Sequence, residues 1–476
     1  MSESSLVSKS RAKPAPAAQN IAAIVAAASF GFVVVQLDVT IVNVALPAMA
    51  SSLKAGIAQL QWVVDAYALV FAVLLLSAGV IGDRLGSRRA YLAGFWIFAA
   101  ASLACGLAPG AFSLIAARAV QGIGAALLVP SSLAILNHVS GHDAGLRARM
   151  VGVWTAAGGV SIAAGPVLGG LLLGAFGWRT IFLVNLPLCA FAIWLTSVVV
   201  PRAEPRDAPK EPKKYRSLDL PGQVLAVAAL TGLVGAVIEA RPLGFAHPLV
   251  IAGAVMAVVA GALFVLVEHR SKAPMLPLGF FARPNFTPAT IFGIMVNLTY
   301  YGVIFVLSLY LQQVKHWTAA QTGLAYLPLT GGFILSNILS GVLVDRFGSR
   351  PPMIAGGLIG TMGFLLLSRL DGHSTYPDML APFLLIPGGM GLAVPAMTTA
   401  ILAGVERQAS GVASAVLNTA RQAAGAIGVA LFGALAANGQ VVPGLHLSAL
   451  ISAGCVLIGA VVVFFGMTSV KASRKA

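Results

Sequence analysis

The sequence predicts an all-α polytopic membrane protein with 14 transmembrane helices, arranged as two six-helix bundles with two additional helices between them. Three observations support this fold class. Of the 476 residues, 58% are hydrophobic and only 9% are charged, whereas roughly 25% of the residues in a soluble domain are charged. The hydrophobic residues form runs long enough to cross a bilayer. One segment of the chain is also repeated at a matching place in the second half.

The apolar runs define the predicted spans. A helix that crosses the hydrocarbon core needs about 20 mostly apolar residues, and charges, prolines and glycine clusters separate such runs. The spans are predicted at 18–47, 58–80, 90–109, 111–137, 149–175, 178–200, 221–241, 247–267, 288–313, 321–344, 352–369, 378–402, 409–436 and 446–467. The first run is too long for a signal peptide and contains Asp38 and Asn43, so an uncleaved first helix is expected.

The basic residues predict the orientation in the membrane. With a cytoplasmic N-terminus and 14 crossings, 23 of the 30 Lys and Arg residues fall on the cytoplasmic side and 5 on the outer side. Cytoplasmic loops are enriched in Lys and Arg, and one helix more or fewer would invert every later loop. We therefore expect a multi-pass protein of the cytoplasmic (inner) membrane with both termini in the cytoplasm. Because orientation explains the net charge of +15, no nucleic-acid partner is expected.

The most charged internal stretch, PRAEPRDAPKEPKKYRSLD, is rich in proline and predicts a linker. A 16-residue segment, 79–94, recurs at 341–356 with 9 identical positions. Each copy lies between the second and third helix of its bundle, as in transporters built from parallel repeats. The predicted divisions are a cytoplasmic tail (1–17), an N-terminal bundle (18–200), a cytoplasmic linker (201–220), two additional helices (221–267), a cytoplasmic loop (268–287), a C-terminal bundle (288–467) and a cytoplasmic tail (468–476).

The repeated segment contains the loop GDRLGSRR and, in its second copy, DRFGSR. This loop resembles the signature between helices 2 and 3 of the major facilitator superfamily, and nearly the whole chain resembles its fourteen-helix drug:proton antiporter branch. The resemblance implies that the two loops gate the cytoplasmic side; the alternative is a positive-inside turn with a structural salt bridge. The gating candidates are Gly82, Asp83, Arg84, Gly86, Arg88, Asp345, Arg346, Gly348 and Arg350.

The segment GGVSIAAGPVLGGLLLG, 158–174, resembles the antiporter signature of this superfamily. Its motif residues are Gly165, Pro166, Gly169 and Gly170. Glycines four residues apart, including Gly174, permit close contact between helices, and the proline removes one helix hydrogen bond. The family often has glycine where Ser161 stands. The resemblance implies export, whereas ordinary helix packing is the alternative.

Two acids and one arginine in predicted spans are the candidates for proton coupling: Asp38, Asp65 and Arg118. Intramembrane acids usually face a cavity and often carry protons, and an arginine cannot discard its own proton. At 100° per residue Asp38 points away from the stripe formed by Gln36, Thr40 and Asn43. The alternatives are a structural pair between Asp38 and an arginine, and an interfacial Asp65 with no role in transport.

Other polar and aromatic residues in the spans are candidates for a substrate cavity: Gln36, Asn43, Gln61, Gln121, Asn297, Tyr300, Tyr301, Asn418 and Arg421. For Arg421, anchoring of its helix is the alternative role. The sequence contains no nucleotide-binding loop and no metal-ligand spacing, so neither a metal nor a cofactor is expected and the coupling ion is the proton. The protein is expected to be a monomeric transporter, not an enzyme, that exports amphipathic small molecules such as drugs, antibiotics or related metabolites. A proton-coupled uptake or metabolite transporter of the same fold, or a non-transporting membrane sensor, are the alternatives.

Overall fold

The computed structural model describes residues 21–468 except 142, 202–218, 272–273, 275, 406–409 and 438. Its secondary structure is helical, with no strand in the described residues. Within that part of the chain, 13 helical segments are long and apolar enough to cross a membrane, so the chain is a multi-pass membrane protein. The predicted tails, apart from Thr468, and most of the predicted linker lie outside the described residues.

The first half of the chain folds as one group of helices. They are α1 (Ile21–Leu53), α2 (Ile57–Leu85), α3 (Ser87–Gly106), α4 (Ala111–Ser140), α5 (Ala144–Phe176), α6 (Thr180–Leu183) and α7 (Asn185–Val199). The helix α1 continues six residues beyond its predicted end at Pro47, because a proline removes only one backbone donor and the adjacent turns keep their own hydrogen bonds. The predicted span 178–200 is divided at Val184 into α6 and α7.

The remaining helices are α8 (Leu220–Leu243), α9 (Pro248–Arg270), η1 (Leu278–Ala282), α10 (Phe286–Leu309), η2 (Tyr310–Val314), α11 (Ala319–Ala325), α12 (Leu327–Phe347), α13 (Arg350–Leu367), α14 (Tyr376–Ala403), α15 (Ser410–Leu435) and α16 (Val441–Gly466). The predicted span 321–344 is divided at Tyr326. The helix α15 is 26 residues long but is not among the 13 apolar segments. Asn418, Arg421 and Gln422 interrupt its apolar run.

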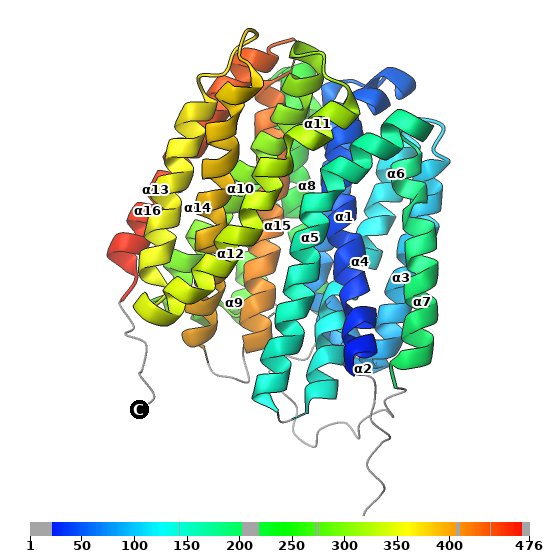
Figure 1. Cartoon of the computed structure of the whole chain (residues 1–476), viewed down its shortest axis with the longest axis vertical. Coiled ribbons are helices and arrows are strands. Elements are labelled where there is room, and N and C mark those ends of the chain that lie inside the picture. The colour runs from blue at the N-terminus through cyan, green and yellow to red at the C-terminus, as the bar shows by residue number, and fades with distance from the viewer. Residues whose placement is uncertain are drawn as a thin grey trace, which may run out of the picture.

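The helices α1 to α7 lie on one side of the molecule and α10 to α16 on the other (Figure 1). The two groups meet along two seams, where α2 packs against α15 and α5 packs against α11 and α12. The helices α8 and α9 lie behind both groups in this view. The helix α8 contacts both α2 and α15, and its Val234 and Ile238 share an apolar cluster with Leu69 and Ala430. It therefore covers one of the two seams.

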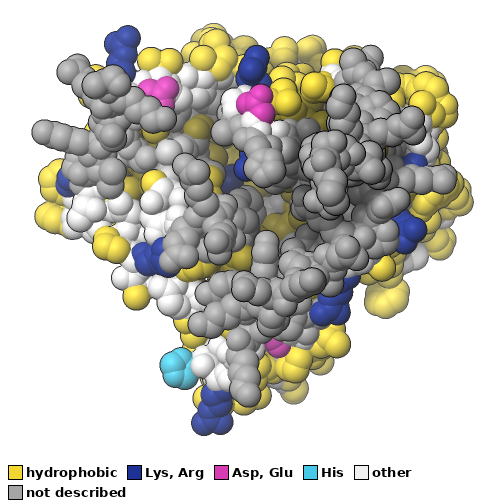
Figure 2. All heavy atoms as spheres, turned by 90° about the horizontal axis from the view of Figure 1, so that it is seen from below, with side chains coloured by type: hydrophobic (Ala, Val, Ile, Leu, Met, Phe, Trp, Pro, Cys, Tyr) yellow, Lys and Arg dark blue, Asp and Glu magenta, His cyan; other side chains and the backbone are white. Residues whose placement is uncertain are grey.

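The two ends of the bundle differ. At the lower end in Figure 1, α1 begins and α16 ends; at the upper end, α1 is followed by α2 and α5 by α6. Figure 2 views the lower end and shows Lys and Arg side chains around its rim. The two groups of helices are joined near the upper end. Nε2 of Gln61 donates to the carbonyls of Val429 and Ala430 at 3.0 and 2.6 Å, and Nε2 of Gln312 donates to that of Val44 at 2.9 Å.

Candidate functional site

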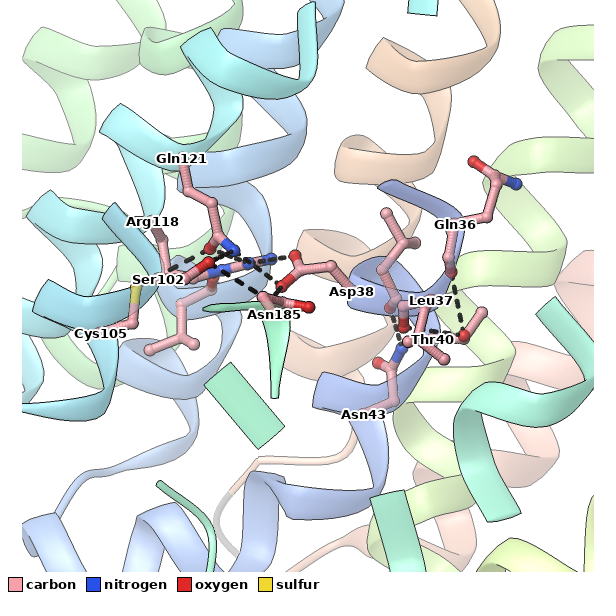
Figure 3. Close-up of polar contacts among 12 residues, drawn as sticks. Gln36, Leu37, Asp38, Thr40, Asn43, Ser102, Cys105, Arg118, Gln121 and Asn185 are labelled. Atoms are coloured by element: carbon pink, nitrogen blue, oxygen red, sulfur yellow. Dashed lines mark hydrogen bonds and ion pairs between the residues drawn. The ribbon is translucent and has the colours of Figure 1, made fainter. Parts of the chain in front are cut away.

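Asp38 of α1 is the common acceptor of a buried polar network inside the first group of helices (Figure 3). Nη1 of Arg118, in α4, lies 2.5 Å from Oδ2 of Asp38. Nε2 of Gln121 donates to Oδ1 at 2.8 Å, and Nδ2 of Asn185 donates to the same atom at 3.1 Å. Asp38 and Arg118 are 0% and 1% exposed. Donors from α4 and α7 thus match the negative charge of Asp38, as a buried ion pair requires.

The same network joins further helices. Nε of Arg118 donates to the carbonyl of Val63 in α2 at 3.0 Å, and Nε2 of Gln121 donates to Oγ of Ser102 in α3 at 2.9 Å. Sequence reasoning identified Asp38, Arg118 and Gln121 but missed Ser102 and Asn185. A single Ser or Asn in an apolar run is a weak signal, because its side chain is often satisfied by the backbone of its own helix. As predicted, Asp38 faces away from Gln36, Thr40 and Asn43 (Figure 3).

Asp65 of α2 has a different environment. The side chain is 0% exposed, and neither carboxylate oxygen has a hydrogen-bond partner in the described residues. It lines a cavity of about 430 Å³ together with Tyr67, Arg118 and, from the second group of helices, Tyr301. A buried carboxylate without donors is costly in its ionised form. Asp65 is therefore a buried acid that the described residues leave without a hydrogen-bond partner.

Arg118 belongs to the surroundings of both acids. It forms the ion pair with Asp38 and also lines the cavity that contains Asp65. Its Cζ atom is 4.3 Å from the centre of the Tyr67 ring, a distance at which a guanidinium and an aromatic face attract each other. One cation thus contacts one acid directly and shares a cavity with the other.

A second cavity, of about 340 Å³, lies between the two groups of helices. It is lined by Thr40, Asn43, Pro166, Tyr300, Tyr301, Ile304, Tyr326, Leu329 and Thr330. Tyr301 lines both cavities, and the Tyr300 ring makes edge contacts with Tyr301 and Phe333. Aromatic rings with a few polar groups suit molecules that are themselves amphipathic.

Of the predicted cavity residues, Asn43, Tyr300 and Tyr301 line these spaces. The others lie outside both linings: Gln36, Gln61, Gln121, Asn297, Asn418 and Arg421. Gln61 bonds to α15, Gln121 belongs to the Asp38 network, and Nδ2 of Asn297 donates to the Gly293 carbonyl of its own helix at 2.8 Å. Gln36, Asn418 and Arg421 are half-buried. Gln422, next to Arg421, lines the Asp65 cavity.

The predicted antiporter motif forms close contacts with two helices. A Cβ atom on Gly165 would lie 1.9 Å from Oγ1 of Thr40 in α1, and one on Gly169 would lie 2.8 Å from Ile41. A Cβ atom on Gly170 would lie 2.4 Å from the Ala319 carbonyl oxygen in α11. The backbones can approach this closely only because side chains are missing. Gly174 has no atom within 4 Å of its Cβ position, so it does not belong to this contact surface.

Pro166 lies within α5. A Cβ atom on Gly323 of α11 would lie 2.2 Å from the carbonyl oxygen of Pro166. Glycines from both groups of helices thus form the seam between α5 and α11.

The two repeated loops have the same backbone geometry. Gly86 and Gly348 have φ values of +87° and +79°, a region that favours glycine, so each loop turns sharply between two helices. Arg88 and Arg350 follow them and reach α7 and α16. Gly82 is buried, whereas Arg84, Asp345 and Arg346 are exposed. The side chain of Asp83 lies outside the described part of the structure.

Two matching groups of helices, with cavities and a buried acid between them, define a secondary transporter. Residues 28–429 match the Major Facilitator Superfamily, and the chain belongs to this superfamily of transporters. It is therefore a transport protein and not an enzyme.

Individual relatives are consistent with this assignment. The chain is 38% identical over 409 residues to the methylenomycin A resistance protein of Streptomyces coelicolor, covering 86% of this chain and 84% of that protein. It is 32% identical over 419 residues to the tetracenomycin C resistance and export protein of Streptomyces glaucescens, covering 88% and 76%. The fold resembles that of the human transporter MFSD10, with a TM-score of 0.63 at 15% identity over 93% of this chain and 99% of that chain.

Proposed function

We propose that this protein exports amphipathic small molecules across the cytoplasmic membrane in exchange for protons, by alternating access. The observation that carries this proposal is the position of Asp65. An acid that receives no hydrogen bond from the described residues lines a cavity between the two groups of helices, where it can exchange a proton with whichever side the cavity faces. Relatives named as resistance and export proteins support outward transport of drugs or antibiotics.

The proposed topology has 14 spans: the 13 apolar segments and α15. The polar residues of α15 keep it out of the apolar set, although it is long enough to cross the membrane. The division into six helices, two additional helices and six helices follows the contacts of the two groups and of α8. The lower end, with Arg84, Arg147 and Arg346, is the proposed cytoplasmic side because cytoplasmic loops are enriched in basic residues. Both termini then lie in the cytoplasm, and a single chain forms the complete transport path.

In this topology the contacts of Gln61, Gln312 and Gly170 close the extracellular side. Opening toward the cytoplasm lets water reach Asp65, and hydration favours the ionised carboxylate and release of the proton. A donor group or cationic group of the substrate then binds where the proton was. Opening to the outside reverses the exchange. Asp38 keeps Arg118 in place through the ion pair, so we assign the proton to Asp65 and the positioning of Arg118 to Asp38.

The proton gradient supplies sufficient energy for this exchange. A membrane potential of about 100 mV is worth about 2.3 kcal/mol for each charge that crosses. That energy corresponds to roughly 50-fold accumulation of the exported molecule for each net charge moved. One proton per substrate is therefore enough for useful resistance when the exported molecule carries no net charge, because the exchange then moves one net charge.

The test uses the purified full chain in liposomes with an imposed pH gradient and a fluorescent amphipathic dye. We expect dye transport opposite to proton flow, and we expect Asp65→Asn to abolish the dependence on the gradient. Asp371→Asn is the matched control. The backbone N–H of His373, with Ser374, holds the pKa of this exposed loop acid below its usual value, so it stays ionised at neutral pH. Transport of dye in the same direction as protons would identify an uptake carrier, and gradient-driven export by Asp65→Asn would overturn the assignment of the proton.

A further inference from the structure

The two arginines within the spans differ in their partners. Arg118 has Asp38 as its counter-ion. Arg421, in the middle of α15, forms no ion pair with any described carboxylate, and its Nε atom is buried with no hydrogen-bond partner in the described residues. A guanidinium keeps its positive charge at every physiological pH, and an unpaired charge at membrane depth is costly. Among the described residues, Arg421 is thus a cation without a counter-ion.

The surroundings of Arg421 place this cation beside the cavity of Asp65. Arg421 and Gly425 are four residues apart and share a face of α15, and Gly425 and Gln422 both line that cavity. Gly425 packs against the ring of Tyr301, which would lie 2.9 Å from a Cβ atom.

We infer that Arg421 is the subsite for an anionic group, such as a carboxylate, on the molecules that this transporter carries. The inference rests on the proposed function, because it assigns a substrate class to the same cavities. The apolar body of the substrate lies against Tyr300 and Tyr301, its anionic group binds Arg421, and a donor or cationic group binds Asp65. The preferred substrates are amphipathic acids or zwitterions. The planar fork of a guanidinium binds a carboxylate through two parallel hydrogen bonds, which a lysine cannot do.

A matched pair of dyes tests this subsite. Rhodamine B carries a free carboxylate and a delocalised cation, and its ethyl ester differs by masking the carboxylate alone. The equilibrium dissociation constants of both dyes are measured by fluorescence anisotropy with the purified full chain in nanodiscs. We expect the wild type to prefer rhodamine B. We expect Arg421→Gln to lower the affinity for rhodamine B roughly 10- to 100-fold and the affinity for the ester less than about twofold. Only the free carboxylate of rhodamine B loses a charge-assisted hydrogen bond in this variant.

Retained binding of the ester shows that Arg421→Gln is folded. Arg421→Lys should fall between Arg421→Gln and the wild type, and Arg369→Gln, which removes an exposed arginine, should leave both affinities unchanged. Wild-type protein that binds the two dyes equally, or does not bind rhodamine B, overturns the inference. An equal loss of both dyes in Arg421→Gln does the same.

A separate measurement keeps this test distinct from that of the proposed function. Liposomes with a pH gradient report whether the ester is exported. If the ester is exported and the wild type shows no preference for the carboxylate dye, the anion subsite is contradicted but proton-driven export is still supported. A carboxylate preference that depends on Arg421, without gradient-driven transport of either dye, supports the subsite and overturns the proposed function.

Discussion

Arg88 and Arg350 occupy matching positions in the two repeated loops, and each donates a hydrogen bond to a carbonyl near the end of the last helix of its own group. Nη2 of Arg88 lies 2.9 Å from the Ser197 carbonyl oxygen in α7, and Nη2 of Arg350 bonds to the Phe464 carbonyl oxygen in α16. The last carbonyls of a helix have no partner within the helix and carry partial negative charge. Each arginine therefore joins the first turn of the third long helix of its group, α3 or α13, to the last turn of the final helix, α7 or α16.

This pairing predicts a stability effect. Arg350→Ala and Arg88→Ala should each lower the free energy of unfolding by about 1 kcal/mol, since each removes a charged donor from a helix end. Lysine at either position should restore part of the loss. Arg89→Ala is the control because Arg89 is adjacent and exposed. Thermal unfolding in detergent measures the effect, and equal melting temperatures for Arg88→Ala and Arg89→Ala would contradict the bracing role.

The acids of the same loops lead to a prediction about gating. Asp83→Asn should slow transport and increase accessibility from the cytoplasmic side, with little change in substrate affinity, because removal of one latch shifts the balance between two states. Asp345→Asn should act in the same direction but more weakly, since Pro351 and Pro352 replace the basic end of the first loop. Spin-label distances between the lower ends of α5 and α12 report the shift. Lost transport with unchanged distances would mean that these acids serve folding or insertion.

The membrane topology is tested by labelling. In a chain without its native cysteines, a cysteine at Ser217 should react with an impermeant reagent from the cytoplasm, and one at Ser374 from the exterior. Ser374 lies in the loop between α13 and α14 at the upper end, opposite the end with most of the basic residues. Labelling of both positions from the same side would contradict the fourteen-span topology.

The sequence predicted the spans well because apolar length is a local property. Most predicted limits agree with the helices to within a few residues, as for 111–137 and α4. The exceptions include the end of α1 and the breaks at Val184 and Tyr326. A proline follows each break within three residues, but the runs stay mostly apolar, so apolar length alone did not show the breaks. The opposite orientations of Asp38 and Thr40 also follow from the helical repeat alone.

The surroundings of the two acids could not be predicted from the sequence. When only its own helix is considered, Asp38 is the main candidate for the proton carrier, since it is an acid in an otherwise apolar stretch. Its three donors come from residues 80, 83 and 147 positions away, and such contacts depend on how the helices pack. The lack of hydrogen-bond donors to Asp65 in the described part of the chain is likewise a property of its neighbours rather than of its own sequence.

The two acids should differ in their effects on stability. Asp38→Asn leaves Arg118 buried without its counter-ion, and breaking a buried ion pair from one side costs about 3–5 kcal/mol. Asp65→Asn removes no hydrogen bond in the described residues, so it should leave the melting temperature nearly unchanged while it removes proton coupling. The double variant Asp38→Asn with Arg118→Gln should recover part of the lost stability without recovering transport. Equal destabilisation by the two single variants would contradict this assignment of roles.

The glycine seam between α5 and α11 provides the last prediction. A side chain at Gly170 would meet the Ala319 carbonyl oxygen at 2.4 Å, whereas one at Gly174 meets no atom within 4 Å. Gly170→Leu should therefore prevent the upper seam from closing and favour the state that is open at the upper end, and Gly174→Leu on the same helix should not. Spin labels at the exposed positions Ser52 and Gln313 measure the separation across the upper end. We expect a longer distance and slow transport in Gly170→Leu, with near-normal values in Gly174→Leu. Identical distance distributions in the two variants would show that the glycines serve packing within one conformation and do not control the exchange between states.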